Sequence, residues 1–307
     1  LIKYIIYSLI KIMFMNIRSY RLEKIMKKIK FLDCTLRDGS YINNSKFGAP
    51  AIKGIIKKMQ DAGADIIECG WLKDAPYEIG SAYYHLPSDM EQYLIDRDDR
   101  CTYVAMIDWD RYDDSMLPLC DGKSINAIRV VFPRGKVRGG LEIAERIRQK
   151  GYQVYLQAAN TLGYSDEELD ELASCVNKFK PVAMSIVDTF GAMYEDDLTH
   201  IVNYLDKRLD TSIGLGFHSH NNQQLSFALS MHFIELLKDS NRDIIVDSSL
   251  SGMGRGAGNT TTELLASYLN RKHHGNYDMD AILDAIDMYI DPIREKYSWG
   301  YSTQYFV

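Results

Sequence analysis

Short apolar runs alternate along the chain with stretches of helical periodicity. Each run ends in polar residues or glycine, and there are eight of them, at residues 29–38, 64–71, 101–108, 127–132, 153–160, 183–189, 212–220 and 243–249. Near-continuous apolar runs of this length predict strands of a parallel sheet that is covered on its faces. The stretches between the runs must then supply the covering helices.

Three of these intervening stretches place apolar residues at i, i+3, i+4 and i+7, which gives a helix one buried stripe. The stripes are Ile52, Ile55, Ile56 and Met59; Leu169, Leu172, Ala173 and Val176; and Leu198, Ile201, Val202 and Leu205. Ser165 and Glu168 have capping-box spacing ahead of one such helix, and Gly63 and Gly151 stand where helices should end. Eight alternating units favour a closed α/β fold, the (β/α)8 TIM barrel, over a doubly wound open sheet.

The chain divides into three segments. In residues 1–25 the apolar stretch from Ile5 to Met15 is broken by Lys11 and is shorter than the ~20 residues of a membrane helix. We expect a dispensable N-terminal extension there, with an amphipathic surface helix as the alternative. Residues 26–275 form the predicted barrel, and residues 276–307 form a short C-terminal helical segment that covers it.

Charge and cysteine content indicate which binding partners and which cellular compartment to expect. The sequence has 42 acidic and 36 basic residues, a formal charge of -6, and no basic block of the kind that follows a phosphate backbone. Its five cysteines are scattered mostly within apolar runs, which is typical of reduced packing residues. We therefore expect a cytoplasmic protein that binds neither nucleic acid nor a membrane.

Polar residues stand at or near the ends of several predicted strands. They are Arg37 and Asp38, Glu68 and Gly70, Gln157 and Asn160, Asp188 and Thr189, and His218 and His220. Because the active sites of barrels lie at the carboxyl ends of the strands, we expect these side chains on one rim.

His218 and His220 are two residues apart on a predicted strand, so their imidazoles point to the same side. With Asp38 as a third ligand, they would leave about three positions open for substrate on an octahedral ion. Oxygen-rich surroundings favour Mg²⁺ or Mn²⁺, and non-haem iron is the alternative metal. The alternative for the residues is two packing histidines and a turn with a salt bridge.

Such an ion, chelated by a 2-oxo acid, withdraws electrons from the carbonyl and stabilises the enolate that forms when a neighbouring carbon–carbon bond breaks. Arg37 could add positive charge at the same oxygen. Glu68 is a candidate for proton transfer, although a buried glutamate more often holds a hydrogen bond behind the site. In the loop at residues 251–259, glycine at every second position indicates either a tight turn or a close backbone approach that brings Asn259 toward the metal.

Five ordered motifs resemble the DRE-TIM metallolyase superfamily, which includes HMG-CoA lyase, isopropylmalate and homocitrate synthases, and 4-hydroxy-2-oxovalerate aldolase. They are Thr35-Leu36-Arg37-Asp38-Gly39, Glu68 with Gly70, Asp188-Thr189 with Gly191, His218-Ser219-His220-Asn221, and Gly254-Arg255-Gly256-Ala257-Gly258-Asn259. The resemblance implies a metal-dependent barrel with Asp38, His218 and His220 as ligands, Asn259 as an occasional fourth, and Arg37 on the enolate oxygen.

The strongest likeness is to the aldolases, at residues 186–193 and 300–305. There a tail tyrosine reaches the active site, which nominates Tyr301, with Tyr305 as the alternative and surface packing as the other explanation. Thr189 is the expected contact for the substrate carboxylate by resemblance to the synthases, and Gln157 is a further substrate-binding candidate.

The chain departs from the aldolases at two places. Tyr41 stands where they carry a catalytic histidine, and a phenol with a pKa near ~10 is a poor base at neutral pH. Tyr41 could act as an acid or orient substrate, while metal-bound water takes the proton. The known aldolases also continue into a helical region that docks an aldehyde dehydrogenase, whereas this chain stops at Val307, so we carry over neither that partner nor acetaldehyde as the product.

The sequence therefore predicts a carbon–carbon lyase, an aldolase that uses Mn²⁺ or Mg²⁺ to cleave a 4-hydroxy-2-oxo acid to pyruvate and an aldehyde, or that runs the reverse condensation. An acyl-CoA-dependent Claisen synthase or lyase is the first alternative. A barrel without turnover that serves binding or assembly is the second. We expect a homodimer, since barrels of this type commonly pair.

Overall fold

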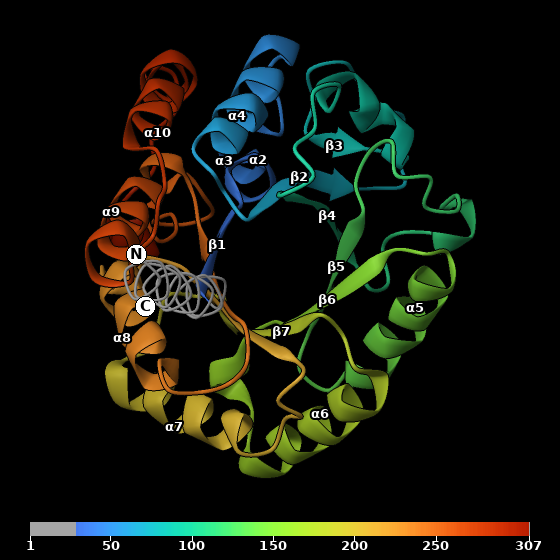
Figure 1. Ribbon diagram of the computed structural model, residues 1–307, viewed down its shortest axis with the longest axis vertical. Coiled ribbons are helices and arrows are strands. Elements are labelled where there is room, and N and C mark those ends of the chain that lie inside the picture. Colours follow the sequence, from blue (N-terminus) through green and yellow to red (C-terminus); the bar gives the residue numbers. More distant parts are fainter. Residues whose placement is uncertain (1–28, 307) are drawn as a thin grey trace, which may run out of the picture.

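Eight parallel strands close into a barrel in the computed structural model, which describes residues 29–306 (Figure 1). The barrel strands are β1 (Ile29–Asp33), β2 (Ile66–Leu72), β4 (Thr102–Asp108), β5 (Ala127–Phe132), β6 (Gln153–Ala158), β7 (Ala183–Asp188), β8 (Gly214–Ser219) and β9 (Ile244–Ser248). β1 pairs with β2 and also with β9, from Ile29 opposite Ile244 to Asp33 opposite Ser248. The (β/α)8 prediction is confirmed, and the open-sheet alternative is wrong. A two-residue strand, β3 (Tyr83–Tyr84), adds to the outer end of β2.

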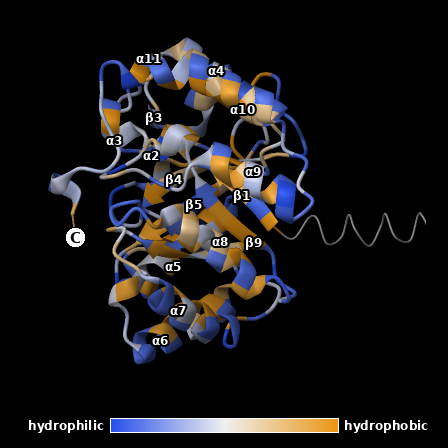
Figure 2. Ribbon diagram, turned by 90° about the vertical axis from the view of Figure 1, so that its left-hand side faces the viewer, coloured by the Kyte–Doolittle hydropathy of each residue, from blue (hydrophilic) through white to orange (hydrophobic). Residues whose placement is uncertain are grey.

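Helices surround the strands, with the apolar residues concentrated in the sheet and on the inner helix faces (Figures 1 and 2). They are α4 (Ala49–Asp61), α5 (Val137–Gln149), α6 (Asp166–Phe179), α7 (Glu195–Asp206), α8 (Ser226–Leu237) and α9 (Thr262–Lys272). The three predicted stripes lie in α4, α6 and α7, and every member is buried. The Ser165–Glu168 capping box forms at the start of α6, and Gly63 and Gly151 both take positive φ just after helices.

The first apolar run contains two elements rather than one. β1 ends at Asp33, and Arg37 and Asp38 lie in the one-turn helix α2 (Thr35–Asp38), which α3 (Ser40–Asn43) follows. The amides of Arg37 and Asp38 both bond to the carbonyl of Cys34, which closes this turn. The prediction that Asp38 ends the first strand is therefore wrong. Asp38 and Arg37 lie in a one-turn helix, which directs their side chains over the mouth of the barrel.

Inside the barrel the side chains form layers, because alternate residues of each strand face inward. The lowest layer is apolar and consists of Leu32, Cys34, Ile66, Val104, Ala127, Tyr155, Ala183 and Ile245. Two residues further along five of the strands the inward positions are polar: Glu68, Arg129, Gln157, Ser185 and Asp247. The interior thus changes from apolar to charged toward the carboxyl ends of the strands.

A short helical part follows the barrel, as predicted. It comprises α10 (Met279–Ala285), a π-helical turn (Ile286–Ile290) and α11 (Asp291–Arg294), and a 3-10 turn (Thr303–Tyr305) lies near its end. This part packs beside α4, where Lys58 pairs with Asp284 at 2.7 Å. Further along, the indole of Trp299 donates to the carbonyl of Ser251, so the tail contacts the loop after β9. The extension expected at residues 1–25 lies outside the described residues.

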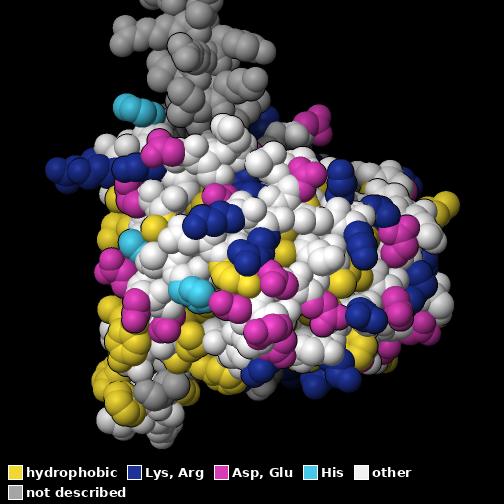
Figure 3. Space-filling model, turned by 90° about the horizontal axis from the view of Figure 1, so that it is seen from below, with side chains coloured by type: hydrophobic (Ala, Val, Ile, Leu, Met, Phe, Trp, Pro, Cys, Tyr) yellow, Lys and Arg dark blue, Asp and Glu magenta, His cyan; other side chains and the backbone are white. Residues whose placement is uncertain are grey.

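Charged side chains of both signs are mixed over the surface seen in Figure 3, and neither sign gathers into a large patch there. Within residues 29–306, no helix is long and apolar enough to cross a membrane.

Candidate metal centre

The structure brings Asp38, His218 and His220 together at the mouth of the barrel. Their candidate ligand atoms all lie within 4.8 Å of one another, and all three side chains are buried. Asp38 comes from α2, His218 from β8, and His220 from the bridge that follows β8 and pairs with Asn259. Because metal–oxygen bonds are about 2.0–2.6 Å long, one ion could bridge such a group.

Both imidazoles are oriented through Nδ1. Nδ1 of His218 lies 2.9 Å from Oδ2 of Asp247, and Nδ1 of His220 lies 3.1 Å from the carbonyl oxygen of Arg255. Each ring therefore keeps Nε2 for an ion, the arrangement usual for histidine ligands. Burial lowers the pKa of His220 to about 4, although Asp38 partly opposes this, so the ring is neutral and able to bind a cation at neutral pH.

Asp38 is held as a carboxylate. Burial by itself would raise its pKa, but Arg37 and the two histidines outweigh this effect and hold the pKa below its usual range. Asn259 donates from Nδ2 to Oδ2 of Asp38 at 2.6 Å, while its own buried Oδ1 has no partner within the described part of the chain. That free oxygen is the atom that a fourth metal ligand would supply.

The glycine-rich loop after β9 approaches the same carboxylate with its backbone. A Cβ at Gly254 would lie 2.6 Å from Oδ2 of Asp38, so any side chain there would displace the ligand. The next amide, that of Arg255, lies 3.3 Å from the same oxygen and donates to it. The loop is thus a tight turn whose backbone contacts Asp38, and its approach to substrate stays a prediction.

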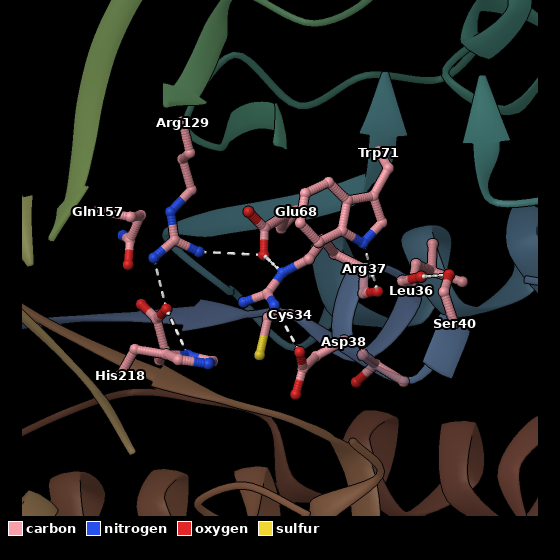
Figure 4. A network of polar contacts seen from close by, with 12 residues as sticks. Cys34, Leu36, Arg37, Asp38, Ser40, Glu68, Trp71, Arg129, Gln157 and His218 are labelled. Carbon is pink, nitrogen blue, oxygen red and sulfur yellow. Dashed lines mark hydrogen bonds and ion pairs between the residues drawn. The ribbon is translucent and has the colours of Figure 1, made fainter. Parts of the chain in front are cut away.

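A series of buried charges starts at Asp38 (Figure 4). Nη1 of Arg37 donates to Oδ1 of Asp38 at 2.5 Å, and Nε of Arg37 donates to Oε2 of Glu68 at 2.7 Å. The backbone carbonyl of Arg37 accepts from the indole of Trp71. Burial opposes the charge on Arg37, but Glu68 and Asp38 raise its pKa well above the ordinary value, so the guanidinium stays charged.

The series continues to His218. Oε2 of Glu68 is also 3.0 Å from Nη1 of Arg129, and Nη2 of Arg129 donates to Oδ2 of Asp247 at 2.5 Å. That same Oδ2 contacts Nδ1 of His218. We call this series the charge chain; its members are Asp38, Arg37, Glu68, Arg129, Asp247 and His218. The three carboxylates of the charge chain outnumber its two guanidiniums in a buried site, which favours binding of a cation beside them.

Glu68 lies beneath Arg37 rather than in the cavity. Its side chain is completely buried, and one oxygen is held by two guanidiniums. These contacts agree with the hydrogen-bonding interpretation of Glu68. Gln157 belongs to the same layer: with its amide turned to satisfy both neighbours, its oxygen accepts from Nε of Arg129 at 3.0 Å and from Ser185.

A cavity of about 180 Å³ opens above the metal cluster. Its lining includes, besides the three candidate ligands and Arg37, the predicted residues Tyr41, Gln157 and Thr189. Thr189 follows β7, and its hydroxyl accepts from the amide of Asn160 at 2.7 Å. Trp71 reaches the cavity because the register of β2 shifts between Glu68 and Trp71.

Tyr41 lies edge-on to Trp71, with ring centroids 6.2 Å apart. Burial raises the pKa of its phenol to about 12, so the hydroxyl is protonated at neutral pH. The structure thus strengthens the expectation that Tyr41 is not the base.

Tyr301 and Tyr305 lie in different surroundings. Tyr301 is 57% exposed and lines a cavity formed by the tail itself, at residues 298–305. Tyr305 lines another cavity, which shares Thr189 and His220 with the metal site. Of the two tail tyrosines, Tyr305 therefore lies beside the metal cavity in this structure.

Three further residues of the site were not predicted from the sequence. Arg129 and Asp247 lie inside apolar runs, where a charge in a buried strand is itself a signal of a partner. Asp108 ends the third apolar run and lines the cavity. The rule that selected residues at strand ends would have selected it too.

The chain is similar to known proteins in sequence and in fold. The HMGL-like family matches residues 137–288. An oxaloacetate decarboxylase of Mycobacterium tuberculosis is 29% identical over 265 residues, which are 83% of this chain and 74% of that protein. A 4-hydroxy-2-oxovalerate aldolase of Geobacillus genomosp. 3 is 26% identical over 276 residues, 87% of this chain and 78% of that protein. The solved N-terminal domain of a Bacteroides vulgatus protein has a TM-score of 0.78 at 26% identity and covers 90% of each chain.

These relatives share the fold and a class of reaction. An aldolase and an oxaloacetate decarboxylase both break a carbon–carbon bond, and the family depends on a divalent metal, for which Asp38, His218 and His220 offer a donor set. The closed barrel and the HMGL-like match point the same way. The chain belongs to the DRE-TIM metallolyase superfamily and is a carbon–carbon lyase.

Proposed function

We propose that this protein is an aldolase that cleaves a 4-hydroxy-2-oxo acid to pyruvate and an aldehyde, or catalyses the reverse condensation. The observation that carries the proposal is the cluster of Asp38, His218 and His220 at the floor of a small cavity, with the guanidinium of Arg37 beside it. Relatives named 4-hydroxy-2-oxovalerate aldolase support the choice of substrate class.

Asp38, His218 and His220 would hold the ion, with Asn259 as an occasional fourth ligand, and Mg²⁺ or Mn²⁺ suits this donor set. When bound, the cation withdraws electrons from the carbonyl of the 2-oxo acid and so favours the enolate. The proposal also includes the cytoplasmic location and the homodimer expected from the sequence; sedimentation of the purified protein would test the dimer.

The protein's own groups would perform the remaining tasks. Arg37 keeps its positive charge because two carboxylates hold it, so it can stabilise the enolate oxygen without losing a proton. Thr189 and Gln157 line the cavity and would bind the substrate carboxylate and orient the oxo acid. Tyr41, protonated at neutral pH, could donate a hydrogen bond to the leaving aldehyde oxygen.

A second candidate reaction is the decarboxylation of oxaloacetate, which the relative in Mycobacterium tuberculosis favours. It breaks the bond between C3 and the departing carboxylate and leaves the same pyruvate enolate. The same cluster and Arg37 would serve it, but no hydroxyl proton has to be removed.

The test uses the full chain, stripped of metal with a chelator and then given Mn²⁺ or Mg²⁺. Pyruvate released from a panel of 4-hydroxy-2-oxo acids is followed with lactate dehydrogenase, in the absence of coenzyme A. We expect release that depends on the metal and is lost in Asp38→Asn. Thiol release from acetyl-CoA would instead support the Claisen enzyme. Metal binding without any turnover would support a binding module.

A further inference from the structure

We propose that Asp108 is the general base that removes the C4 hydroxyl proton of the substrate. This inference rests on the proposed aldolase function. It identifies the general base, because Tyr41 stands where the aldolases carry a catalytic histidine. Two observations carry it: Asp108 lines the cavity, and among the described residues of the cavity wall no other group is free to accept a proton.

Asp108 is the last residue of β4, where it follows Val104 and Met106 at two-residue intervals. Val104 lies in the apolar layer inside the barrel, and Met106 lines the cavity, so the same face of β4 points inward along its whole length. Asp108 is opposite Val131 of β5, and both line the cavity that contains the metal cluster. A substrate bound over the cluster therefore meets this carboxylate at the wall.

The carboxylate of Asp108 is unpaired. Within residues 29–306 it accepts no hydrogen bond and forms no ion pair at 4.0 Å or less, although it is largely shielded from solvent. The ammonium of Lys73 lies instead over the rings of Trp71 and Tyr83, 4.7 Å from each centroid. A carboxylate with free lone pairs facing a substrate cavity is a group that can accept a hydroxyl proton.

Electrostatics fit the same role. Burial raises the pKa of Asp108 above its ordinary value, and Asp110 adds to this, while Lys73, Arg111 and Arg37 oppose it. Tyr41 also faces this carboxylate and stays neutral. A raised pKa makes a carboxylate a stronger base.

The other ionisable groups of the cavity wall are unsuitable. They are Arg37, Asp38, Tyr41, His218, His220 and Arg255. Asp38 and the two histidines would use their lone pairs on the ion, and guanidiniums do not release protons at working pH. Tyr41 is already protonated. Glu68 does not line the cavity, and Arg37 and Arg129 hold its carboxylate.

The step balances without any further reactant. The carboxylate of Asp108 takes the proton of the C4 hydroxyl, the oxygen lone pair forms the aldehyde carbonyl, and the electrons of the C3–C4 bond pass to the pyruvate enolate. The resulting carboxylic acid of Asp108, or water, then returns one proton to C3 and gives pyruvate. Decarboxylation of oxaloacetate forms the same enolate without the first proton transfer.

This difference between the reactions provides the experiment. In Asp108→Asn we expect kcat for aldol cleavage to fall by about 10²–10⁴-fold, the range that positioned bases contribute. The ratio of aldol cleavage to oxaloacetate decarboxylation should fall by at least about 100-fold. Wild-type kcat/KM for cleavage should decline as the pH falls through the pKa of Asp108, because protonation removes the base, and Asp108→Asn should lack this decline. Asp108→Glu should recover part of the rate.

Asp110→Asn is the matched control, because this neighbouring aspartate is exposed. Calorimetric titration with Mn²⁺ shows whether each variant keeps the metal cluster, and Asp108→Asn should bind Mn²⁺ as the wild type does. If Asp108→Asn retained cleavage within tenfold, or lost both reactions equally, Asp108 would not be the base, and the aldolase function would still stand. If the wild type cleaved none of the 4-hydroxy-2-oxo acids, both proposals would fail.

Discussion

The polar side chains on two sides of the cavity differ in whether they have hydrogen-bond or ion-pair partners. On one side, each member of the charge chain from Asp38 to His218 contacts an oppositely charged or polar neighbour. On the other side, Tyr41 and Asp108 face the cavity without a hydrogen-bond partner within residues 29–306. Paired buried groups are held in one ionisation state, whereas the unpaired carboxylate of Asp108 has free lone pairs that can accept a proton. The paired side can therefore hold an ion, and the unpaired side is where proton transfer can take place.

The largest effect should come from removing a metal ligand at the end of the charge chain. His218→Ala should abolish tight Mn²⁺ binding and lower pyruvate release by at least about 1,000-fold, or about 4 kcal/mol of transition-state stabilisation. Calorimetry and the coupled assay measure the two losses. His200→Ala is the control, since this histidine is exposed on α7 and pairs with Asp166. Unchanged Mn²⁺ affinity in His218→Ala would rule out the cluster as the metal site.

Breaking the middle of the charge chain should act mainly on stability. Arg129→Met leaves Glu68 and Asp247 buried without their shared counter-charge, which should lower the free energy of unfolding by about 3–5 kcal/mol. Urea denaturation measures this change. The exposed Arg134–Glu168 pair is the matched contrast, and Arg134→Met should cost about 1 kcal/mol or less.

Asp247→Asn tests whether the charge chain orients His218, apart from its contribution to the stability of the protein. It keeps the size of the side chain but removes the charge beside Nδ1 of His218. We expect Mn²⁺ affinity to fall by about 10–100-fold, as when a partner behind a metal ligand is lost. An unaltered affinity would mean that the packing of β8, rather than Asp247, sets the orientation of His218.

The smallest effect should be on the unpaired side. Tyr41→Phe removes a hydroxyl that does not need to ionise, so cleavage should slow by less than about tenfold, with no change in its decline at low pH. The pH profile of kcat/KM is the measurement. A loss as large as that expected for Asp108→Asn would move the base from Asp108 to Tyr41 and reverse the assignment.

Most of the fold could be predicted from the sequence, because the buried face of each helix or strand requires apolar residues at a regular spacing. The stripes of α4, α6 and α7 and the ends of β4, β5 and β7 lie within a residue or two of the predicted positions. The first apolar run failed because its apolar positions continue from β1 into α2, and hydropathy alone does not mark where a strand gives way to one helical turn.

The candidate site was predicted in its ligands but not in what holds them. Asp38, His218 and His220 stand in recognisable motifs. Arg129 and Asp247 are 118 residues apart in sequence, and only the folded barrel brings them within hydrogen-bonding distance. Asp108 was overlooked for a different reason. It ends its apolar run just as the selected residues do, but it belongs to none of the recognisable motifs.

The loop after β9, the last strand of the barrel, donates hydrogen bonds to a carboxylate that follows the first strand. Asn259 and the amide of Arg255 both donate to Asp38, which follows the first strand. During synthesis, a nascent chain that has reached only residue 240 already carries Asp38 and both histidines but lacks the strand and loop that would bring them into place. Tight ion binding would thus require the completed barrel, and a bound ion would in turn stabilise it.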